Sequence, residues 1–350
     1  MPLKSIFRTV LLLSILSLST SCLAQVPAVS PVPPVADVPF QRLQGEFARA
    51  AKSAGGTLGA SAVHLESGRR VGFLPTERFP MASTYKIPIA VQLLHLVDQG
   101  TISLDRMIDL KASDFHPGSG MLTELLSRSG VSLSVRNLLE LMLVLSDNSA
   151  TDLLLRLAGG PEAVTARMRA MGIVDMDIHR PTVKMIADSE GYALPSEREW
   201  KPDLFQKLYE GTTEESRKAS LRSFQTDPRD SSSPEAMAML LERIWRGAGL
   251  KTESRALLLD IMERCQTGRA RIKGILPPGT VVVHKTGTFS GITNDVGIIT
   301  LPQDAGHVAI AVFVKSSEKT PAERERSIAQ VSRAVYDFFL FQPADRGMMK

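Results

Sequence analysis

Residues 83–86 read Ser-Thr-Tyr-Lys, and two further short motifs follow in order, Ser-Asp-Asn at 146–148 and Lys-Thr-Gly-Thr at 285–288. An S-x-x-K sequence alone is weak, and a second copy at 316–319 lies in a polar run that we interpret as a solvated loop. S-x-N and K-T-G each occur once in the chain. Together the motifs supply a serine nucleophile beside an amine, a second hydroxyl with an amide, and a cationic strand edge. They predict a serine acyl-transfer site.

At these residues the chain resembles the penicillin-recognising serine enzymes, and among them the class A β-lactamases. The resemblance runs from about residue 40 to about residue 342. Residues 141–152 resemble that family's helix leading into the S-D-N loop, and residues 267–277 resemble its T-G-x-x-R-I-R-x-x-L-P segment. Asn294 and Asp295 after the K-T-G strand fit as well. The resemblance implies a serine hydrolase that opens β-lactam amides through an acyl-enzyme on Ser83.

Ser83 and Lys86 are three residues apart, which places them on one face of a helix. A serine hydroxyl needs a base to take its proton. A lysine buried near other cations has a lowered pKa and can act as that base. Taken without the other motifs, Ser83 is equally well explained as a helix cap and Lys86 as a solvated residue of the first turn.

The Ser-Asp-Asn motif has two interpretations. Serine and asparagine are common in loops and caps after helices. The family resemblance implies instead that the Ser146 hydroxyl relays a proton between Lys86 and the leaving nitrogen, and that the Asn148 amide holds the side-chain carbonyl of the substrate. Asp147 is expected to point away and organise the loop.

Lys285 follows an apolar strand and begins the third motif. The resemblance implies that Lys285 and the Thr286 hydroxyl bind the substrate carboxylate. Gly287 lets a substrate approach the backbone closely, and the Thr288 amide forms an oxyanion hole with the amide of Ser83.

Arg271 is the candidate for the arginine that many relatives place behind the substrate carboxylate. The stretch after Gly287, where some relatives carry this arginine, holds Ile292 and Thr293 instead. Arg271 matches the position that supplies it in other members. A surface or structural arginine is the alternative.

One family element is absent. Class A β-lactamases carry an E-x-x-L-N loop whose glutamate activates the water that frees the acyl-enzyme, and residues 179–188 match this loop here. Arg180 fits, but Thr182 stands at the glutamate position and Ile186 at the asparagine position. A long charged segment, 189–226, follows. Four acids remain open as replacements for the glutamate: Asp188, Glu190, Glu197 and Glu199.

The N-terminus has the pattern of a secretory signal. Lys4 and Arg8 precede an apolar run at 10–18, and a small residue, Ala24, offers a cleavage site. We expect a signal peptide at 1–24, a proline-rich linker at 25–39 and a secreted or periplasmic protein with no stable membrane span after cleavage. A lipoprotein anchored through Cys22 is the less favoured alternative, because Ser19 replaces the usual leucine.

Composition argues against several other classes of protein. The formal charge of +4 falls to +2 without Lys4 and Arg8, and no basic stripe with aromatic residues marks a nucleic-acid surface. The histidines form no metal-binding spacing, and no G-x-S-x-G elbow is present. We therefore expect no metal, cofactor or nucleic acid. Only Cys265 would remain after cleavage at Ala24, so no internal disulfide is expected, and the protein is expected to be a monomer.

The expected fold is α/β of the α+β type. Strands are predicted at 58–65, 70–74, 281–286, 295–301 and 308–314, with helices between and beyond them. The terminal strands would form one antiparallel sheet flanked by helices, with an all-helical lobe inserted. The resulting catalytic domain spans 40–342, with a sheet lobe at 40–82 and 270–342 and a helical lobe at 83–269.

Three functions remain open. The first is a β-lactamase. The second is a penicillin-binding or D-alanyl peptidase-like acyl enzyme with slow deacylation, acting on a peptidoglycan-like acyl-D-alanine substrate. The third is a non-catalytic ligand-sensing domain, which the intact Ser83, Lys86, Ser146 and Lys285 argue against.

Overall fold

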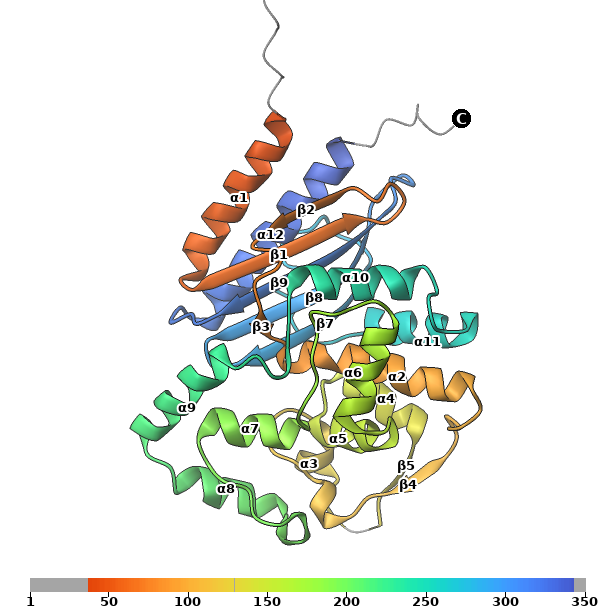
Figure 1. Cartoon of the computed structure of the whole chain (residues 1–350), viewed down its shortest axis with the longest axis vertical. Coiled ribbons are helices and arrows are strands. Elements are labelled where there is room, and N and C mark those ends of the chain that lie inside the picture. The colour runs from red at the N-terminus through yellow and green to blue at the C-terminus, as the bar shows by residue number, and fades with distance from the viewer. Residues whose placement is uncertain (1–36, 129, 343–350) are drawn as a thin grey trace, which may run out of the picture. The chain divides into compact units, whose positions relative to one another are not determined.

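The computed structural model describes residues 37–128 and 130–342, and a five-stranded antiparallel sheet forms its centre (Figure 1). The spatial order is β2-β1-β9-β8-β7. The strands are β1 (Thr57–His64), β2 (Arg70–Phe73), β7 (Val282–Phe289), β8 (Ile292–Thr300) and β9 (His307–Lys315). β1 pairs with β9 along its whole length, from Thr57 opposite Lys315 to His64 opposite Val308. The first and last strands of the chain thus join in one sheet, as predicted.

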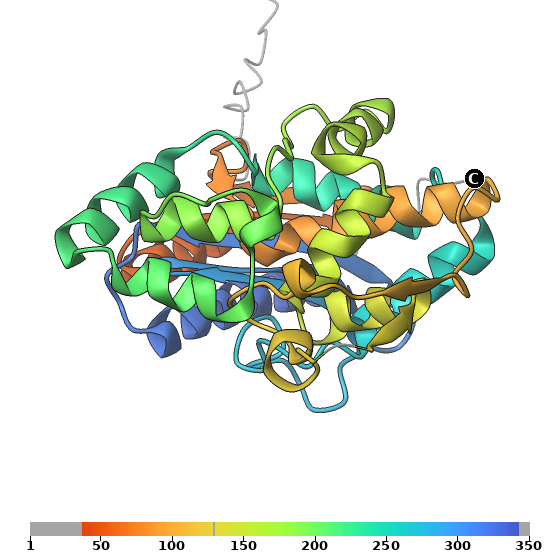
Figure 2. The same ribbon diagram turned by 90° about the horizontal axis from the view of Figure 1, so that it is seen from below.

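Alternation along β9 explains why the sheet is covered on both faces. Ile310, Val312 and Val314 pack in one apolar cluster with α1 (Val38–Ala54) and α12 (Pro321–Phe341). Ala309, Ala311 and Phe313 belong to a second cluster, which includes α10 (Pro234–Trp245). Successive side chains of a strand point to opposite faces. A strand that is apolar at every position therefore needs a helical layer on each side. Figure 2 shows the sheet from its edge, with helices on both sides of it.

The other helices lie mainly in a second region, below the sheet in Figure 1. Its central helix is α2 (Lys86–Asp98), which is buried at every position from 86 to 94 and packs against α4, α5, α6 and α11. A helix that is apolar all round is stable only when other helices enclose it. The other helices of this region are α3 (Met121–Leu125), α4 (Val135–Val144), α5 (Asn148–Leu157), α6 (Gly160–Ala170), α7 (Thr182–Glu190), α8 (Pro202–Glu210), α9 (Glu214–Thr226) and α11 (Thr252–Glu263).

The structure differs from expectation in three places. Helix α10 falls within 83–269, the expected helical lobe, yet it packs on β1, β8 and β9 because its apolar face completes the second cluster. The charged segment 189–226, in which the sequence patterns predict no particular element, contains α8 and α9. Ser83 does not open an α-helix. It lies in a 3-10 turn, η1 (Ala82–Tyr85), and α2 begins at Lys86.

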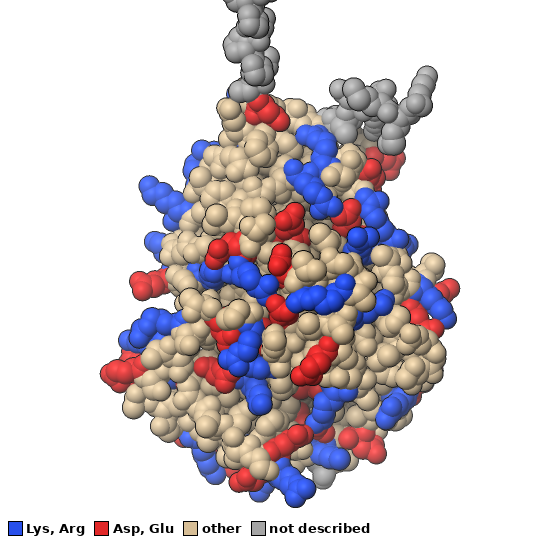
Figure 3. All heavy atoms as spheres, viewed as in Figure 1, with Lys and Arg blue, Asp and Glu red and all other residues tan. Residues whose placement is uncertain are grey.

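The surface carries mixed charge on the face shown in Figure 3, where basic and acidic side chains are interspersed over the sheet and the helical region. Cys265 is a buried free thiol. Within the described residues, no helix combines the length and the apolar character that a membrane crossing requires.

Candidate active site

Ser83 lies in the turn η1, directly before α2. The preceding residue, Ala82, has a φ of 46°, a left-handed conformation that costs a non-glycine residue about 1–3 kcal/mol. The Thr84 hydroxyl donates a hydrogen bond of 2.8 Å to the Met81 carbonyl across this turn. The surrounding structure thus holds the half-buried Ser83 on a strained backbone at the wall of a cavity.

Lys86 is fully buried one turn further on. Its ammonium donates to the Ser146 carbonyl at 2.7 Å, to Ser146 Oγ at 3.1 Å and to Asn148 Oδ1 at 2.9 Å. Burial lowers the pKa of Lys86 well below its ordinary value, and the charge of Lys285 lowers it further. The Ser83 hydroxyl makes no hydrogen bond with another side chain or backbone group of the described residues, 37–128 and 130–342. Lys86 therefore has the lowered basicity that was expected, with Ser146 as its direct hydroxyl partner.

Ser146 connects the second motif to the third. Its backbone has a φ of 63°, which turns the chain between α4 and α5. Lys285 Nζ donates to Ser146 Oγ at 3.0 Å and to the Thr286 carbonyl at 2.9 Å. Burial lowers the pKa of Lys285 to about 8. One hydroxyl oxygen thus lies between two buried amines, an arrangement that can pass a proton from one amine to the other.

Asn148 and Asp147 are held by different neighbours. Asn148 accepts from Lys86, and its Nδ2 donates to the Pro117 carbonyl at 2.9 Å. The Asp147 carboxylate accepts from the amides of Ala150 and Leu122, each at 2.9 Å. Asp147 therefore caps α5 and ties it to α3, the loop-organising position expected for it.

Gly287 brings strand β7 against the turn that carries Ser83. A Cβ built at Gly287 would lie 2.5 Å from the Met81 carbonyl oxygen and 3.0 Å from the Ser83 amide nitrogen. The chain itself thus requires a glycine here, in addition to the expected approach of a substrate. Asn294 on β8 strengthens the same junction, because its Nδ2 donates to the carbonyls of Pro80 at 2.9 Å and Met81 at 3.0 Å.

Arg271 lies against β7 and is largely buried. Its guanidinium donates to Thr288 Oγ1 at 2.8 Å, to the Gly287 carbonyl at 3.2 Å and to Glu325 at 3.0 Å. This cation therefore sits beside the two last residues of the third motif. The Thr286 hydroxyl lies 2.6 Å from that of Thr267, a neighbour that the motifs did not indicate.

One cavity of about 450 Å³ is bordered by six of the residues described above: Ser83, Ser146, Asn148, Arg271, Thr286 and Thr288. Several of its residues were not predicted as site residues: Gly118, Ser119, Thr267, Phe289 and Ser290. Of these, only Thr267 lies in a segment that the family resemblance marks, 267–277. Ser119 bonds the Ser146 carbonyl at 2.8 Å. The Gly-Ser-Gly sequence at 118–120 was a possible signal, since such a loop can lie close to another backbone.

Thr182, at the expected glutamate position, also borders this cavity as the first residue of α7. Its hydroxyl lies 2.5 Å from the hydroxyl of Tyr85, and its amide donates to Asp152 Oδ1 at 2.6 Å. Burial raises the pKa of Tyr85 well above its ordinary value, so this hydroxyl remains protonated. The side chains at this position, Thr182 and Tyr85, are therefore neutral hydroxyls, and the neighbouring Asp152 carboxylate is held by the Thr182 and Val183 amides and by His116.

The four acids considered as replacements for the glutamate differ in their ion pairs and in their position relative to the cavity. Asp188 pairs with Arg180 at 2.6 Å, and Glu197 pairs with Arg156 at 2.9 Å. Glu199 is exposed, like Glu197, in the 3-10 turn η3 (Glu197–Glu199). Of these acids, only Glu190 borders the cavity within the described chain.

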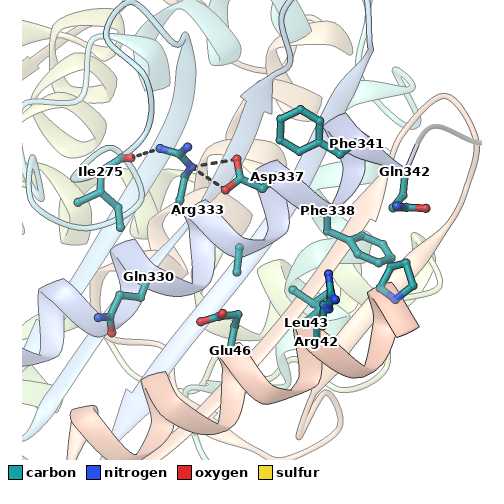
Figure 4. A pocket seen from close by; sticks show the side chains of 12 residues that line it. Arg42, Leu43, Glu46, Ile275, Gln330, Arg333, Asp337, Phe338, Phe341 and Gln342 are labelled. Carbon is teal, nitrogen blue, oxygen red and sulfur yellow. Dashed lines mark hydrogen bonds and ion pairs between the residues drawn. The ribbon is translucent and has the colours of Figure 1, made fainter. Parts of the chain in front are cut away.

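A second cavity, of about 490 Å³, lies between α1 and α12 (Figure 4). Arg333 donates there to Asp337 and to the Ile275 carbonyl, and Phe338 and Phe341 add apolar surface. The residues of the three motifs do not line it. The first cavity is therefore the candidate active site.

Comparison with known proteins identifies the family of the chain. Residues 42–339 match the profile of the Beta-lactamase enzyme family. The chain is 34% identical to the extended-spectrum beta-lactamase PER-1 of Pseudomonas aeruginosa over 274 residues, which cover 76% of this chain and 77% of PER-1. It is 28% identical to the carbapenem-hydrolyzing beta-lactamase KPC of Klebsiella oxytoca, with 94% of this chain and 96% of KPC covered.

Solved structures show the same fold. A beta-lactamase from Chitinophaga pinensis superimposes with a TM-score of 0.69 and 32% identity, covering 85% of this chain and 98% of that one. An ancestral class A beta-lactamase does so with a TM-score of 0.69 and 31% identity, covering 84% and 99%. With these matches over most of its length, the chain belongs to the beta-lactamase family and is a serine hydrolase of the class A type.

Proposed function

We propose that this enzyme opens β-lactam amides through an acyl-enzyme on Ser83. The observation that carries the proposal is the convergence of Ser83, Ser146 and Asn148 on one cavity, with Lys86 and Lys285 bonded to Ser146 behind its wall. Family membership supports the same chemistry.

In the acylation step, Ser83 Oγ attacks the lactam carbonyl carbon while its proton passes to neutral Lys86. The C–N bond then breaks, and the proton moves through the Ser146 hydroxyl to the leaving nitrogen. The short contacts of Ser146 Oγ with both lysines support this relay. A positioned acid–base group of this kind contributes about 10²–10⁴-fold to the rate.

The amides of Ser83 and Thr288 would bind the developing oxyanion. The close approach of Gly287 to the Ser83 amide supports this pairing, because Thr288 follows directly on β7. Loss of one such donor costs about 10²–10³-fold in rate.

The substrate would lie with its carboxylate at Lys285, Thr286 and Arg271, and with its side-chain carbonyl at the Asn148 amide. Burial of Lys285 favours an anionic ligand, since a buried charge is stabilised by a partner of opposite sign, whereas Arg271 is already paired with Glu325.

The rate of deacylation distinguishes the second candidate function, a peptidase-like acyl enzyme, from a β-lactamase. Thr182 and Tyr85 supply no carboxylate at the position where relatives activate water. We therefore expect the acyl-enzyme to form faster than it breaks down. If breakdown is very slow, the protein acts as a peptidase-like acyl enzyme that β-lactams trap.

We further propose that residues 1–24 are a signal peptide and 25–39 a linker, and that residues 40–342 form the exported catalytic domain, active as a monomer in the periplasm or outside the cell. Residues 1–36 lie outside the described residues. Anchoring through Cys22 remains the alternative. Hydrolysis of β-lactams in that compartment would make the host resistant to them.

The test uses purified protein with a chromogenic cephalosporin and with benzylpenicillin, followed by absorbance and by intact mass. Many turnovers per enzyme support the β-lactamase, and a lasting one-to-one adduct on Ser83 supports the trapped acyl enzyme. Ser83→Ala should lose both signals. Activity retained in that variant, or neither signal from the unaltered protein, would overturn the proposal.

A further inference from the structure

We propose that Glu190 selects substrates that carry a positive charge on the acyl side chain, so that the site favours zwitterionic β-lactams. This inference rests on the proposed function, because it assumes that the substrate carboxylate lies at Lys285 and Arg271. It concerns the part of the same cavity that α7 borders.

Three residues of α7 border the cavity: Thr182, Ile186 and Glu190. They are four positions apart and so share one face of the helix. Along this face the helix rises about 12 Å from Thr182 to Glu190. Glu190 is the only acid that borders the cavity in the described part of the chain, and it lies two turns away from the Thr182 position.

The contacts of Gly118 show which part of a substrate would reach this end. A Cβ built there would lie 2.6 Å from Asn148 Nδ2 and 3.3 Å from Ile186 Cδ1. Ile186 is therefore a close neighbour of the amide proposed to hold the side-chain carbonyl. A substrate whose acyl side chain extends beyond that carbonyl would therefore place the added group past Ile186, toward Glu190.

Another part of the cavity wall is formed by the turn between β7 and β8. Gln225 on α9 donates to the Ser290 carbonyl at 3.2 Å, and the rings of Phe224 and Phe289 pack edge to face at 5.0 Å. Phe289 and Ser290 border the cavity. Helix α9 thus fixes this part of the wall.

The Glu190 carboxylate is available to a ligand. Across residues 37–128 and 130–342, its side chain makes no hydrogen bond or ion pair with another residue. Burial raises its pKa, and the charge of Arg217 on α9 opposes this in part.

Among the described residues, the cavity is therefore bordered by one acid, Glu190, and Lys285 lies bonded to Ser146 behind its wall. A ligand whose opposite charges match both Lys285 and Glu190 gains specificity as well as affinity. The fitting substrate class is a β-lactam with a carboxylate on its ring and an ammonium group just beyond the side-chain carbonyl.

Benzylpenicillin and ampicillin differ by one ammonium group at that place and make a matched pair. We expect Glu190→Gln to lower the ampicillin to benzylpenicillin ratio of kcat/KM about fivefold, as for a half-buried charged hydrogen bond. Glu190→Lys should lower it further, and Glu190→Asp should keep the preference. Glu199→Gln, an exposed acid away from the cavity, is the control and should keep the wild-type ratio.

Binding to a Ser83→Ala background, measured by calorimetry, separates this inference from the proposed function. A fall in relative ampicillin affinity on adding Glu190→Gln supports the subsite even if the enzyme does not turn over. An unchanged ratio in Glu190→Gln and Glu190→Lys, or an equal loss for both penicillins, would overturn the inference and leave hydrolysis at Ser83 standing.

Discussion

Lys86 and Lys285 bond the same oxygen atom, with their Nζ atoms 3.1 Å and 3.0 Å from Ser146 Oγ. Both lysines are fully buried, and the pKa of each is lowered by that burial. Two ammonium groups on one neutral oxygen repel each other, which favours the loss of a proton from one of them. The charge of Lys285 lowers the pKa of Lys86 in addition to burial, so we expect Lys86 to be the amine that loses the proton.

Ser146→Ala tests this shared contact. It removes the only side-chain atom that bonds both amines in the described structure. We expect the acylation rate constant to fall about 10²–10⁴-fold, the range for loss of a positioned proton relay. Stopped-flow measurement with a chromogenic cephalosporin checks this, with circular dichroism to verify folding. Acylation at the wild-type rate would exclude Ser146 from the relay.

The dependence of kcat/KM on pH should show an alkaline limb near pH 8. The folded-state pKa of Lys285 is about 8, below its ordinary value, so the cation that binds the substrate carboxylate is lost as the pH rises through 8. Lys86 must be neutral to act as a base, so activity should also fall at low pH, as Lys86 takes up a proton. The methyl ester of the same penicillin lacks the carboxylate and should lack the alkaline limb. An identical limb for acid and ester would assign it to another group.

Thr182→Glu restores a carboxylate at the position where relatives carry one. Thr182 borders the cavity, so the new carboxylate can reach a water beside the acyl-enzyme. We expect the deacylation rate constant to rise at least about tenfold, since general-base catalysis contributes about 10²–10⁴-fold. The wild-type enzyme should show a burst of one product per site, and Thr182→Glu should reduce it. Thr182→Gln is the neutral control. An equal rise in both variants would mean that the carboxylate is not the cause.

Gly287→Ala tests the junction between β7 and the Ser83 turn. The added Cβ would lie 2.5 Å from the Met81 carbonyl, so the backbone must shift at a cost of about 1–3 kcal/mol in stability. We expect a lower Tm and at least a tenfold loss of kcat/KM, because the Ser83 amide moves with the turn. Gly45→Ala on α1, where the nearest side-chain atom is 3.5 Å away, is the matched control. It should keep full activity and gain about 0.5–1 kcal/mol of helix stability.

The local elements were largely predictable from the sequence. The hairpin of β1 and β2, the apolar strand β9 and the capped start of α10 at Ser233 all follow from patterns within a few residues. The exceptions were segments without a strong pattern. The charged residues 214–226 form α9 because Phe224 and Gln225 are buried against the sheet region, a stabilisation that composition does not reveal.

The sequence by itself determined which chemical groups are present and in which order: a serine beside a lysine at 83–86, a hydroxyl and an amide at 146–148, and a strand ending in lysine, threonine and glycine at 285–287. Only the tertiary structure decided that Ser146, 60 residues from Lys86 and 139 from Lys285, bonds both, and that Glu190 reaches the cavity while Glu197 does not. The physical reason is the distance along the chain over which each effect acts. Periodicity and capping act over about one turn of chain, whereas contacts between distant segments depend on how complete helices and strands pack against one another.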